Sequence, residues 1–452
     1  MFDVAVVGGG VVGCAVARRF TLGGARVLLL EKGADILSGA SKGNSAILHT
    51  GFDAPAGSLE LTCMQEGYAE YCEIRERLGL PLLESGAIVA AWSETQLDRL
   101  ANIVAAAHGN GVDDVKFVHR SEILAREPEL SEHILGGVLV PREHLIDPWS
   151  APLAYVLQAL ENGAEVRRNT EVLSGVFGAG AWRLETSTGV VDARTVVNCA
   201  GLFGDVVDER LTGAKQFSIK PRKGQFVVFD KAAANLLRTI LLPVPEERTK
   251  GIVLTPTVFG NLLVGPTAEE QDSRERASTD TVALNMLIEK AVEMLPALNG
   301  MAVTATYAGI RPATEEKSYR VRYETAQNYI VLGGIRSTGL TAALGLAQHA
   351  WRLYGRMHQE IAAPVWPSAP RLAEHCRRDW QEPGYGEIVC HCELVTRREV
   401  EAALEGPLPA QDWGGLKRRT RVGMGRCQGF YCNASIAALT FGRLTPPLAE
   451  AV

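Results

Sequence analysis

Residues 3–13 read DVAVVGGGVVG, an apolar run that leads into a glycine-rich turn. The apolar run Asp3–Val7 has the length of a buried strand, and Cys14–Leu22 has the pattern of a helix. A second apolar strand, RVLLLE, follows at residues 26–31. Strand, glycine turn, helix and strand in this order predict a βαβ unit and place the chain in the α/β class.

The three glycines of the turn, Gly8-x-Gly10-x-x-Gly13, have the spacing of a dinucleotide-binding site. Glycine permits the tight turn and the close backbone approach that place a pyrophosphate at the helix N-terminus. Glu31 follows Gly10 by 21 residues, where its carboxylate can accept from a ribose hydroxyl. The motif alone leaves NAD, FAD and a purely structural glycine turn open.

Three further segments distinguish these alternatives: SGASKGNS at 38–45, VVNCAG at 196–201 and VLGGIRSTGLT at 331–341. With them the chain resembles the FAD-dependent oxidoreductases of the D-amino acid oxidase superfamily over roughly residues 1–360. The stretch SKGNSAILHTGFDAPAGSLE, residues 41–60, is similar to the branch of glycerol-3-phosphate dehydrogenases and oxidases and L-2-hydroxyglutarate oxidases. The resemblance implies one FAD, and no cysteine or histidine has the context of a covalent attachment point.

The resemblance also implies which residues hold the flavin. The adenosine half would lie on Gly8–Gly13 and Glu31, and the isoalloxazine near Asn44, Ser45 and Gly339–Thr341. A helix N-terminus at Gly339 would place backbone donors near flavin N1 and O2. The full set of expected cofactor residues is Gly8, Gly10, Val12, Gly13, Glu31, Lys32, Ser41, Asn44, Ser45, Val172, Ala200, Gly201, Gly309, Gly334, Gly339, Leu340 and Thr341.

Four residues are candidates for the substrate side. Oxidation of a carbon that bears a hydroxyl or amine needs a base for the heteroatom's proton, and His49 in LHTG matches a histidine near the flavin in the resembling branch. Arg311 in YAGIRPAT matches an arginine that binds a substrate carboxylate or phosphate. Arg336 adds a cation where relatives often carry an acidic or neutral residue. Lys223 in PRKGQ resembles a family position at the edge of the substrate pocket. A structural role remains the alternative for His49 and Arg311, and a solvated lysine remains the alternative for Lys223.

The four cysteines Cys390, Cys392, Cys427 and Cys432 form two close pairs near the C-terminal end. Four thiolates from two loops suit zinc or a 2Fe-2S cluster. The segments VCHCELVTRREV and GMGRCQGFYC resemble the bacterioferritin-associated-ferredoxin-like domain appended to anaerobic glycerol-3-phosphate dehydrogenases and to subunits of opine and hydrogen cyanide-forming dehydrogenases. The resemblance implies a 2Fe-2S cluster held by these four cysteines.

Composition and charge exclude several classes of function. The 46 basic and 52 acidic residues give a net charge of -6 without a basic block, which argues against a nucleic-acid partner. No stretch is long and apolar enough to span a bilayer, and no signal peptide is evident. We therefore expect a cytoplasmic protein, compatible with peripheral attachment to the inner face of the membrane through a partner.

The expected architecture has three parts. A Rossmann-like FAD-binding domain takes residues 1–80, 147–214 and 300–362, and an α+β substrate domain with a mixed sheet takes 81–146 and 215–299. After a linker at 363–384, a small helical 2Fe-2S domain takes 385–452. β-rich runs between 215 and 265 and a helix over Thr281–Leu295 are expected in the substrate domain.

The expected function is a dehydrogenase that oxidises a small anionic secondary alcohol, of the glycerol-3-phosphate or 2-hydroxy acid type. Electrons would pass singly through the cluster to an electron-accepting subunit or a quinone-linked partner, so the chain is expected in a hetero-oligomer. Two alternatives remain: one subunit of an amine or imino-acid dehydrogenase, and a non-catalytic flavin and iron–sulfur protein that only transfers electrons.

Overall fold

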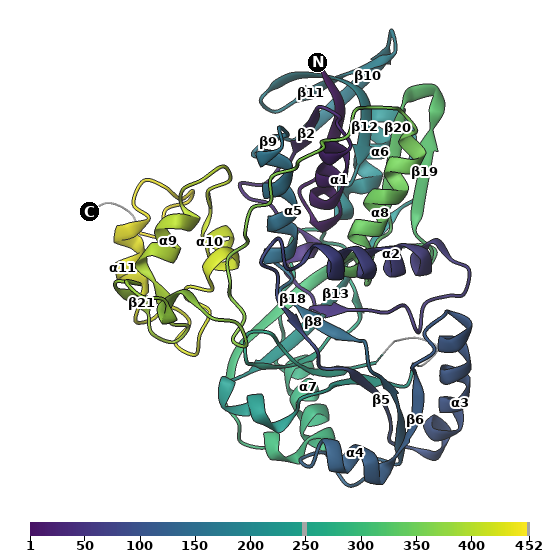
Figure 1. Ribbon diagram of the computed structural model, residues 1–452, viewed down its shortest axis with the longest axis vertical. Coiled ribbons are helices and arrows are strands. Elements are labelled where there is room, and N and C mark those ends of the chain that lie inside the picture. The colour runs from purple at the N-terminus through teal and green to yellow at the C-terminus, as the bar shows by residue number, and fades with distance from the viewer. Residues whose placement is uncertain (246–250, 450–452) are drawn as a thin grey trace.

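The chain folds around two large sheets, with a separate small lobe at the C-terminal end (Figure 1). A computed structural model describes residues 1–245 and 251–449. The first sheet and its helices form the upper part of Figure 1, the second sheet the lower part, and the C-terminal lobe stands beside both. Within the described residues, no helix has both the length and the apolar character that a bilayer span needs.

The first sheet contains the predicted βαβ unit. Its central strand β1 (Phe2–Val7) lies parallel to β2 (Val27–Leu30) and β12 (Gly189–Asn198). Alternate residues enter different cores: Val4 and Val6 face the helices, whereas Ala5 and Val7 face the opposite side. Both faces are therefore buried, as a parallel sheet requires. The remaining strands are β9 (Glu165–Arg167), β10 (Val172–Gly178), β11 (Ala181–Thr186), β19 (Arg320–Glu324) and β20 (Tyr329–Gly333).

Helices α1 (Val11–Leu22), α5 (Ser150–Glu161) and α8 (Gly339–Tyr354) pack on one face of this sheet, α2 (Leu59–Ile74) packs on α8, and one shorter helix packs on the other face. These four longer helices share a core with β1 and β2. Helix α6 (Gly204–Thr212) packs on the opposite face. Because β20 and α8 come from the third segment of the chain, this domain is assembled from discontinuous pieces, as expected.

Among the described residues, the second sheet has nine strands and mixed pairing. Its longest pair joins β13 (Ile219–Phe229) to β18 (Val303–Thr314), in register from Ile219 opposite Thr314 to Val228 opposite Ala305, with a shift before Phe229 opposite Val303. Residues 303–314 thus lie in this sheet, although the expected boundary at residue 300 places them in the FAD-binding domain. The other strands are β5 (Ala87–Ala91), β6 (Lys116–His119), β7 (Gly136–Val140), β14 (Ile240–Pro243), β15 (Val253–Pro256), β16 (Leu262–Gly265) and β17 (Glu269–Glu270).

Helices and a small sheet complete the second domain. Helix α7 (Thr281–Met294), with Asp280 as its N-cap, buries Leu287 and Ala291 against the second sheet. The other helices are α3 (Glu94–Gly109) and α4 (Arg120–Arg126). Between the two large sheets, β8 (His144–Ile146) pairs with both β3 (Ile47–Leu48) and β4 (Leu82–Leu83).

The C-terminal lobe has its own small core and docks on the rest of the molecule through charged groups. It contains β21 (Ile388–Cys390), β22 (Val395–Thr396), α9 (Arg397–Ala403), α10 (Trp413–Thr420) and α11 (Asn433–Leu439). Arg419 of α10 forms a buried two-bond ion pair with Asp35, with distances of 2.7 and 2.8 Å. Gly415 permits this contact, since a Cβ there would lie 1.8 Å from an Asp35 carboxylate oxygen.

Candidate functional site

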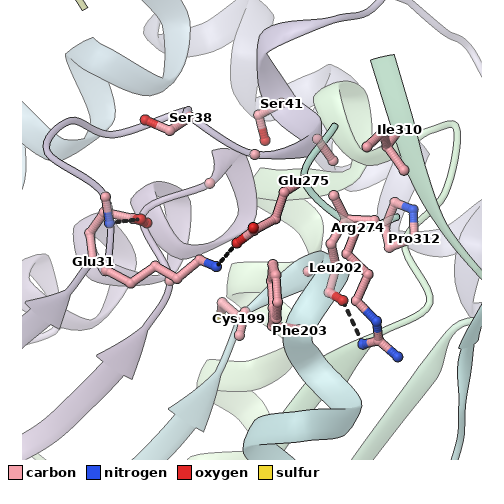
Figure 2. Close-up of a pocket in the computed structure, with 18 of the residues that line it drawn as sticks. Glu31, Ser38, Ser41, Cys199, Leu202, Phe203, Arg274, Glu275, Ile310 and Pro312 are labelled. Carbon is pink, nitrogen blue, oxygen red and sulfur yellow. Dashed lines mark hydrogen bonds and ion pairs between the residues drawn. The ribbon is translucent and has the colours of Figure 1, made fainter. Parts of the chain in front are cut away.

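A cavity of about 690 Å³ opens at the C-terminal ends of β1, β2 and β12. The first turn of α1 forms one wall, with Gly10, Val11 and Val12. Figure 2 shows Glu31 at one end of the cavity and Ile310 and Pro312 of β18 at the other. An elongated cavity with a helix N-terminus in its wall suits a dinucleotide, because N–H groups at a helix N-terminus can donate to phosphate oxygens.

Two glycines of the motif are required by backbone contacts. Gly8 has φ +107°, and a Cβ there would lie 2.6 Å from the Cys199 carbonyl oxygen. A Cβ on Gly13 would lie 1.9 Å from the Gly8 carbonyl oxygen, so Gly13 serves the packing of helix on strand and does not line the cavity. Neither position can carry a side chain, so these two glycines fix the turn and its packing beside the cavity.

Glu31 lies at the end of β2, as the βαβ spacing predicts. Its carboxylate accepts from the backbone N–H of Gly9 at 2.6 Å and from that of Gly33 at 2.7 Å. Burial raises the pKa of Glu31, and these backbone donors oppose the rise. Each carboxylate oxygen can accept more than one hydrogen bond, so Glu31 retains capacity for a ribose hydroxyl.

A segment from the second domain closes the cavity from the opposite side, and it was not foreseen from the sequence. We call residues 273–278 the strap. Arg274 forms an ion pair with Asp205 and donates to the Leu202 carbonyl oxygen at 2.9 Å (Figure 2). Glu275 pairs with Lys32 at 3.0 Å. No motif in the sequence marks this segment, because its role depends on side chains supplied by another domain.

The structure brings most of the expected cofactor residues to this cavity. The residues that line it are Gly8, Gly10, Val12, Glu31, Lys32, Ser41, Val172, Ala200, Gly201 and Gly339. The expected residues outside its wall are Gly13, Asn44, Ser45, Gly309, Gly334, Leu340 and Thr341. Gly309 and the Asn44 loop nevertheless meet beside it, because Gly43 packs on Gly309 and the Tyr307 hydroxyl donates to the Asn44 carbonyl oxygen at 2.9 Å.

Arg311 of β18 is a partly buried cation, and none of the described residues gives it a carboxylate partner. Its guanidinium donates to the Thr267 carbonyl oxygen, at 3.4 Å. Gly224 on the neighbouring strand leaves room for it, since a Cβ there would lie 2.8 Å from the guanidinium. Burial, followed by the charges of Arg222 and Arg336, lowers the pKa of Arg311 to about 10. This arrangement favours an incoming anion.

The four substrate-side candidates do not all lie together. Arg336 precedes α8 and is close enough to Arg311 to repel its charge. Lys223 follows Arg222, which is directly opposite Arg311, and therefore lies on the other face of the sheet. There Lys223 pairs with Glu269 at 2.9 Å and with Asp280 at 3.8 Å.

His49 follows β3, and its backbone N–H donates to the Thr341 hydroxyl in the first turn of α8 at 3.0 Å. Its ring Nδ1 lies 2.7 Å from a carboxylate oxygen of Glu143. Glu143 was not expected at the site, because it lies 94 positions away along the chain and belongs to no motif. A pairing between a histidine and a buried carboxylate is an arrangement that can orient a base.

The four cysteines of the C-terminal lobe stand as two touching pairs, Cys392 with Cys427 and Cys390 with Cys432. In the part of the chain that the structure describes, no closed set of three or more metal ligands is formed. Backbone N–H groups, chiefly that of Tyr431, lower the pKa of Cys427, whereas burial raises the pKa of Cys432 to about 12. Thiols gathered around backbone donors fit a metal–sulfur centre, whose negative charge those donors stabilise.

Two known families match the segments in which the two sites lie. The family described as "FAD dependent oxidoreductase" matches residues 3–353, and the "BFD-like [2Fe-2S] binding domain" matches residues 388–439. A glycerol 3-phosphate dehydrogenase from Caloramator mitchellensis is 31% identical, with 100% of this chain and 96% of that protein covered. One subunit of the anaerobic glycerol-3-phosphate dehydrogenase of Escherichia coli (strain K12) is 26% identical over 97% of this chain and 87% of that protein.

The fold is also similar to that of a solved relative. The FAD-bound, dithionite-reduced L-alpha-glycerophosphate oxidase from Mycoplasma pneumoniae aligns with a TM-score of 0.77 and 26% identity. The alignment covers 82% of this chain and 99% of the oxidase. The part of this chain that matches the separate 2Fe-2S family begins at residue 388, after the oxidoreductase match ends at residue 353.

Proposed function

Because the chain belongs to the FAD dependent oxidoreductase family and carries a BFD-like 2Fe-2S domain, we propose that it is a dehydrogenase of glycerol 3-phosphate. FAD, when bound, accepts the hydride from the carbon that bears the hydroxyl, and the C-terminal cluster takes the electrons onward singly. The choice of glycerol 3-phosphate as substrate follows the names of two relatives, a glycerol 3-phosphate dehydrogenase and a glycerol 3-phosphate oxidase.

The observation that carries the substrate assignment is the uncompensated charge of Arg311. A partly buried guanidinium without a carboxylate partner among the described residues is costly unless a ligand supplies the anion. Arg336 lies close by and adds a second positive charge. Two cations suit a phosphate, which carries up to two negative charges, better than the single carboxylate of a zwitterionic amino acid.

The protein's own residues supply the remaining steps of the proposal. Arg311 and Arg336 hold the phosphate, and His49 accepts the proton of the substrate hydroxyl. Gly8, Gly10 and the first turn of α1 hold the pyrophosphate, and the strap excludes water from the nucleotide cavity. Cys390, Cys392, Cys427 and Cys432 would hold the cluster. Lys223 has no part in substrate binding in this proposal, because it is paired on the opposite face of the sheet.

A protein partner would accept the electrons. One relative is, by its name, a single subunit of an anaerobic dehydrogenase, which supports an assembly of several chains. A partner that passes electrons to quinone would bring this chain to the inner face of the membrane.

The test is anaerobic mixing of the FAD-loaded protein with single substrates while flavin absorbance is recorded. We expect glycerol 3-phosphate to bleach the flavin, and glycerol, the same alcohol without the anion, to fail at equal concentration. Bleaching by D- or L-amino acids but not by glycerol 3-phosphate would identify an amine dehydrogenase instead. Bleaching by dithionite but by none of the substrates, including 2-hydroxy acids, would leave a protein that only transfers electrons.

A further inference from the structure

Glu143 is a fully buried carboxylate that three donors surround. One oxygen lies 2.7 Å from His49 Nδ1. The other accepts from the Thr50 backbone N–H at 2.6 Å and from the Thr50 hydroxyl at 2.8 Å. A buried carboxylate whose two oxygens are assigned to different donors has a fixed orientation, since rotation would break the bonds on both sides.

Backbone pairing builds this contact. Strands β3 and β8 are antiparallel with Leu48 opposite His144, so the next residues outward, His49 and Glu143, face each other. The Thr341 hydroxyl holds the His49 backbone from the other side. The imidazole is thus positioned by the register of a sheet and by the first turn of α8, and not by a mobile loop.

We propose that Glu143 is a positioning residue that sets the tautomer of His49. In a neutral imidazole that faces a carboxylate oxygen, Nδ1 is the nitrogen that carries the proton and donates, and Nε2 keeps the lone pair. The inference rests on the proposed role of His49 as the base. In that step the substrate O–H bond breaks as an Nε2–H bond forms, the carbon–oxygen double bond forms, and the hydride passes from the carbon to FAD.

The substitution Glu143→Gln has a specific consequence because the two oxygens have different partners. Thr50 donates twice to one position, so the amide oxygen stays there and the amide nitrogen faces His49. That nitrogen donates, and Nδ1 must then accept and lose its proton to Nε2. The other titratable groups near Glu143 are Tyr68 of α2 and its own neighbours Arg142 and His144. None of them takes the place of the carboxylate at Nδ1.

The experiment is ¹⁵N NMR of histidine-labelled protein without substrate, with the His49 resonances assigned by their loss in His49→Gln. We expect the Nδ1-protonated tautomer in the natural protein and the Nε2-protonated tautomer in Glu143→Gln. Flavin reduction in that variant should slow by about 100-fold or more while FAD stays bound. The matched control is Asp114→Asn, which removes a carboxylate paired with the adjacent Arg142 and should change neither readout.

Each outcome decides the question. An Nε2-protonated His49 in the natural protein would overturn the proposal even if Glu143→Gln failed to fold, because that spectrum needs no variant. An unchanged tautomer or an unchanged reduction rate in a folded Glu143→Gln would also overturn it. Since the tautomer is read without substrate, an error in the substrate assignment would appear in the bleaching test and leave the NMR result intact.

Discussion

At the scale of single residues, Arg311 owes its role to its surroundings. A surface arginine is hydrated and paired, whereas Arg311 is partly buried beside Arg222 and Arg336, and burial followed by these charges lowers its pKa to about 10. An anion bound beside Arg311 would offset both the cost of burying its charge and the repulsion from the neighbouring arginines. The binding energy therefore comes from a charge that the fold leaves uncompensated.

Arg311→Lys tests this role. A lysine keeps the charge but replaces the planar fork with a single ammonium group, so we expect the KM for glycerol 3-phosphate to rise by about 30-fold, or about 2 kcal/mol. FAD content should not change. Arg222→Lys is the matched control because Arg222 is directly opposite Arg311 but pairs with Glu270, and its effect should stay below about threefold. Equal KM values for Arg311→Lys and the natural protein would assign Arg311 a structural role.

The residues of the site differ in how far the sequence reveals them. Gly8, Gly10 and Glu31 follow from spacing alone, because the nucleotide site is built from one short βαβ unit. His49 and Arg311 were found only through resemblance to a family. Glu143 could not be found, because a strand pairing between distant segments brings it to His49, and nothing in PREHL marks that pairing.

At the scale of elements, the strap over the nucleotide cavity depends on an ion pair. Burial alone would raise the pKa of Asp205, but hydrogen bonds from Arg274 and from the Ile219 N–H outweigh burial and place the pKa below 3.8. Because the pKa of Asp205 is lower in the folded protein than in the unfolded chain, the ion pair stabilises the fold fully at pH values above the unfolded pKa. This stabilisation is lost as the pH falls through the folded pKa. The strap should therefore hold throughout the neutral range and open in acid below about pH 4.

Arg274→Ala should weaken FAD binding by about 1–2 kcal/mol at pH 7, because it removes a charge-assisted pair and leaves Asp205 buried. In the natural protein this contribution is lost when Asp205 is protonated, so the difference in FAD binding between the two proteins should shrink as pH falls below about 4. FAD release followed by flavin fluorescence across about pH 3–8 measures both effects. The control Arg183→Ala, which removes an exposed pair with Asp192, should give the same curve of FAD release against pH as the natural protein. A curve for Arg274→Ala that overlays the natural one would show that the strap does not retain FAD.

The elements themselves were predictable where their signals are local. The βαβ opening, the strands between residues 215 and 265, and the helix from Thr281 are all present, with α7 ending at Met294 instead of Leu295. Strand β18 was not foreseen, because Gly309 and Pro312 interrupt its apolar pattern. Its partner β13 lies far earlier in the chain, and this long-range pairing, rather than local propensity, makes residues 303–314 a strand.

At the scale of the whole molecule, a buried ion pair between Arg419 and Asp35 helps to fasten the C-terminal lobe to the nucleotide domain, beside hydrogen bonds such as that from Arg418 to the Ile36 carbonyl oxygen. Arg419→Ala would leave Asp35 fully buried with only Arg168, at 3.5 Å, as an ionic partner among the described residues. Removing one member of a buried pair costs about 3–5 kcal/mol. We expect the lobe to undock and limited proteolysis to cut between residues 363 and 384 much faster. Arg443→Ala, whose pair with Glu405 is exposed, should digest like the natural protein. If Arg419→Ala and the natural protein were cleaved at the same rate, this ion pair would not be what holds the lobe in place.

Replacing Cys427 and Cys432 together with serine separates the two halves of the proposed reaction. The flavin should still be bleached by substrate, because the nucleotide cavity lies in another domain. Turnover with the natural electron acceptor should stop, since electrons could no longer leave singly through the cluster. Iron and sulfide analysis comes first, and zinc in place of iron would make the lobe structural. Full turnover by the double variant would mean that electrons leave the flavin directly.

The discontinuous first sheet sets an order of assembly during synthesis. Strand β20 and helix α8 complete the nucleotide domain, so no nascent chain shorter than about residue 354 contains all of its elements. Domains fold as units as they leave the ribosome, and the lobe with the four cysteines follows later, with its first strand beginning at Ile388. The nucleotide domain can therefore complete its fold while the segment with the four cysteines is still being translated. Insertion of the cluster would then be the last step of maturation, carried out on a chain whose docking face, including Asp35, is already in place.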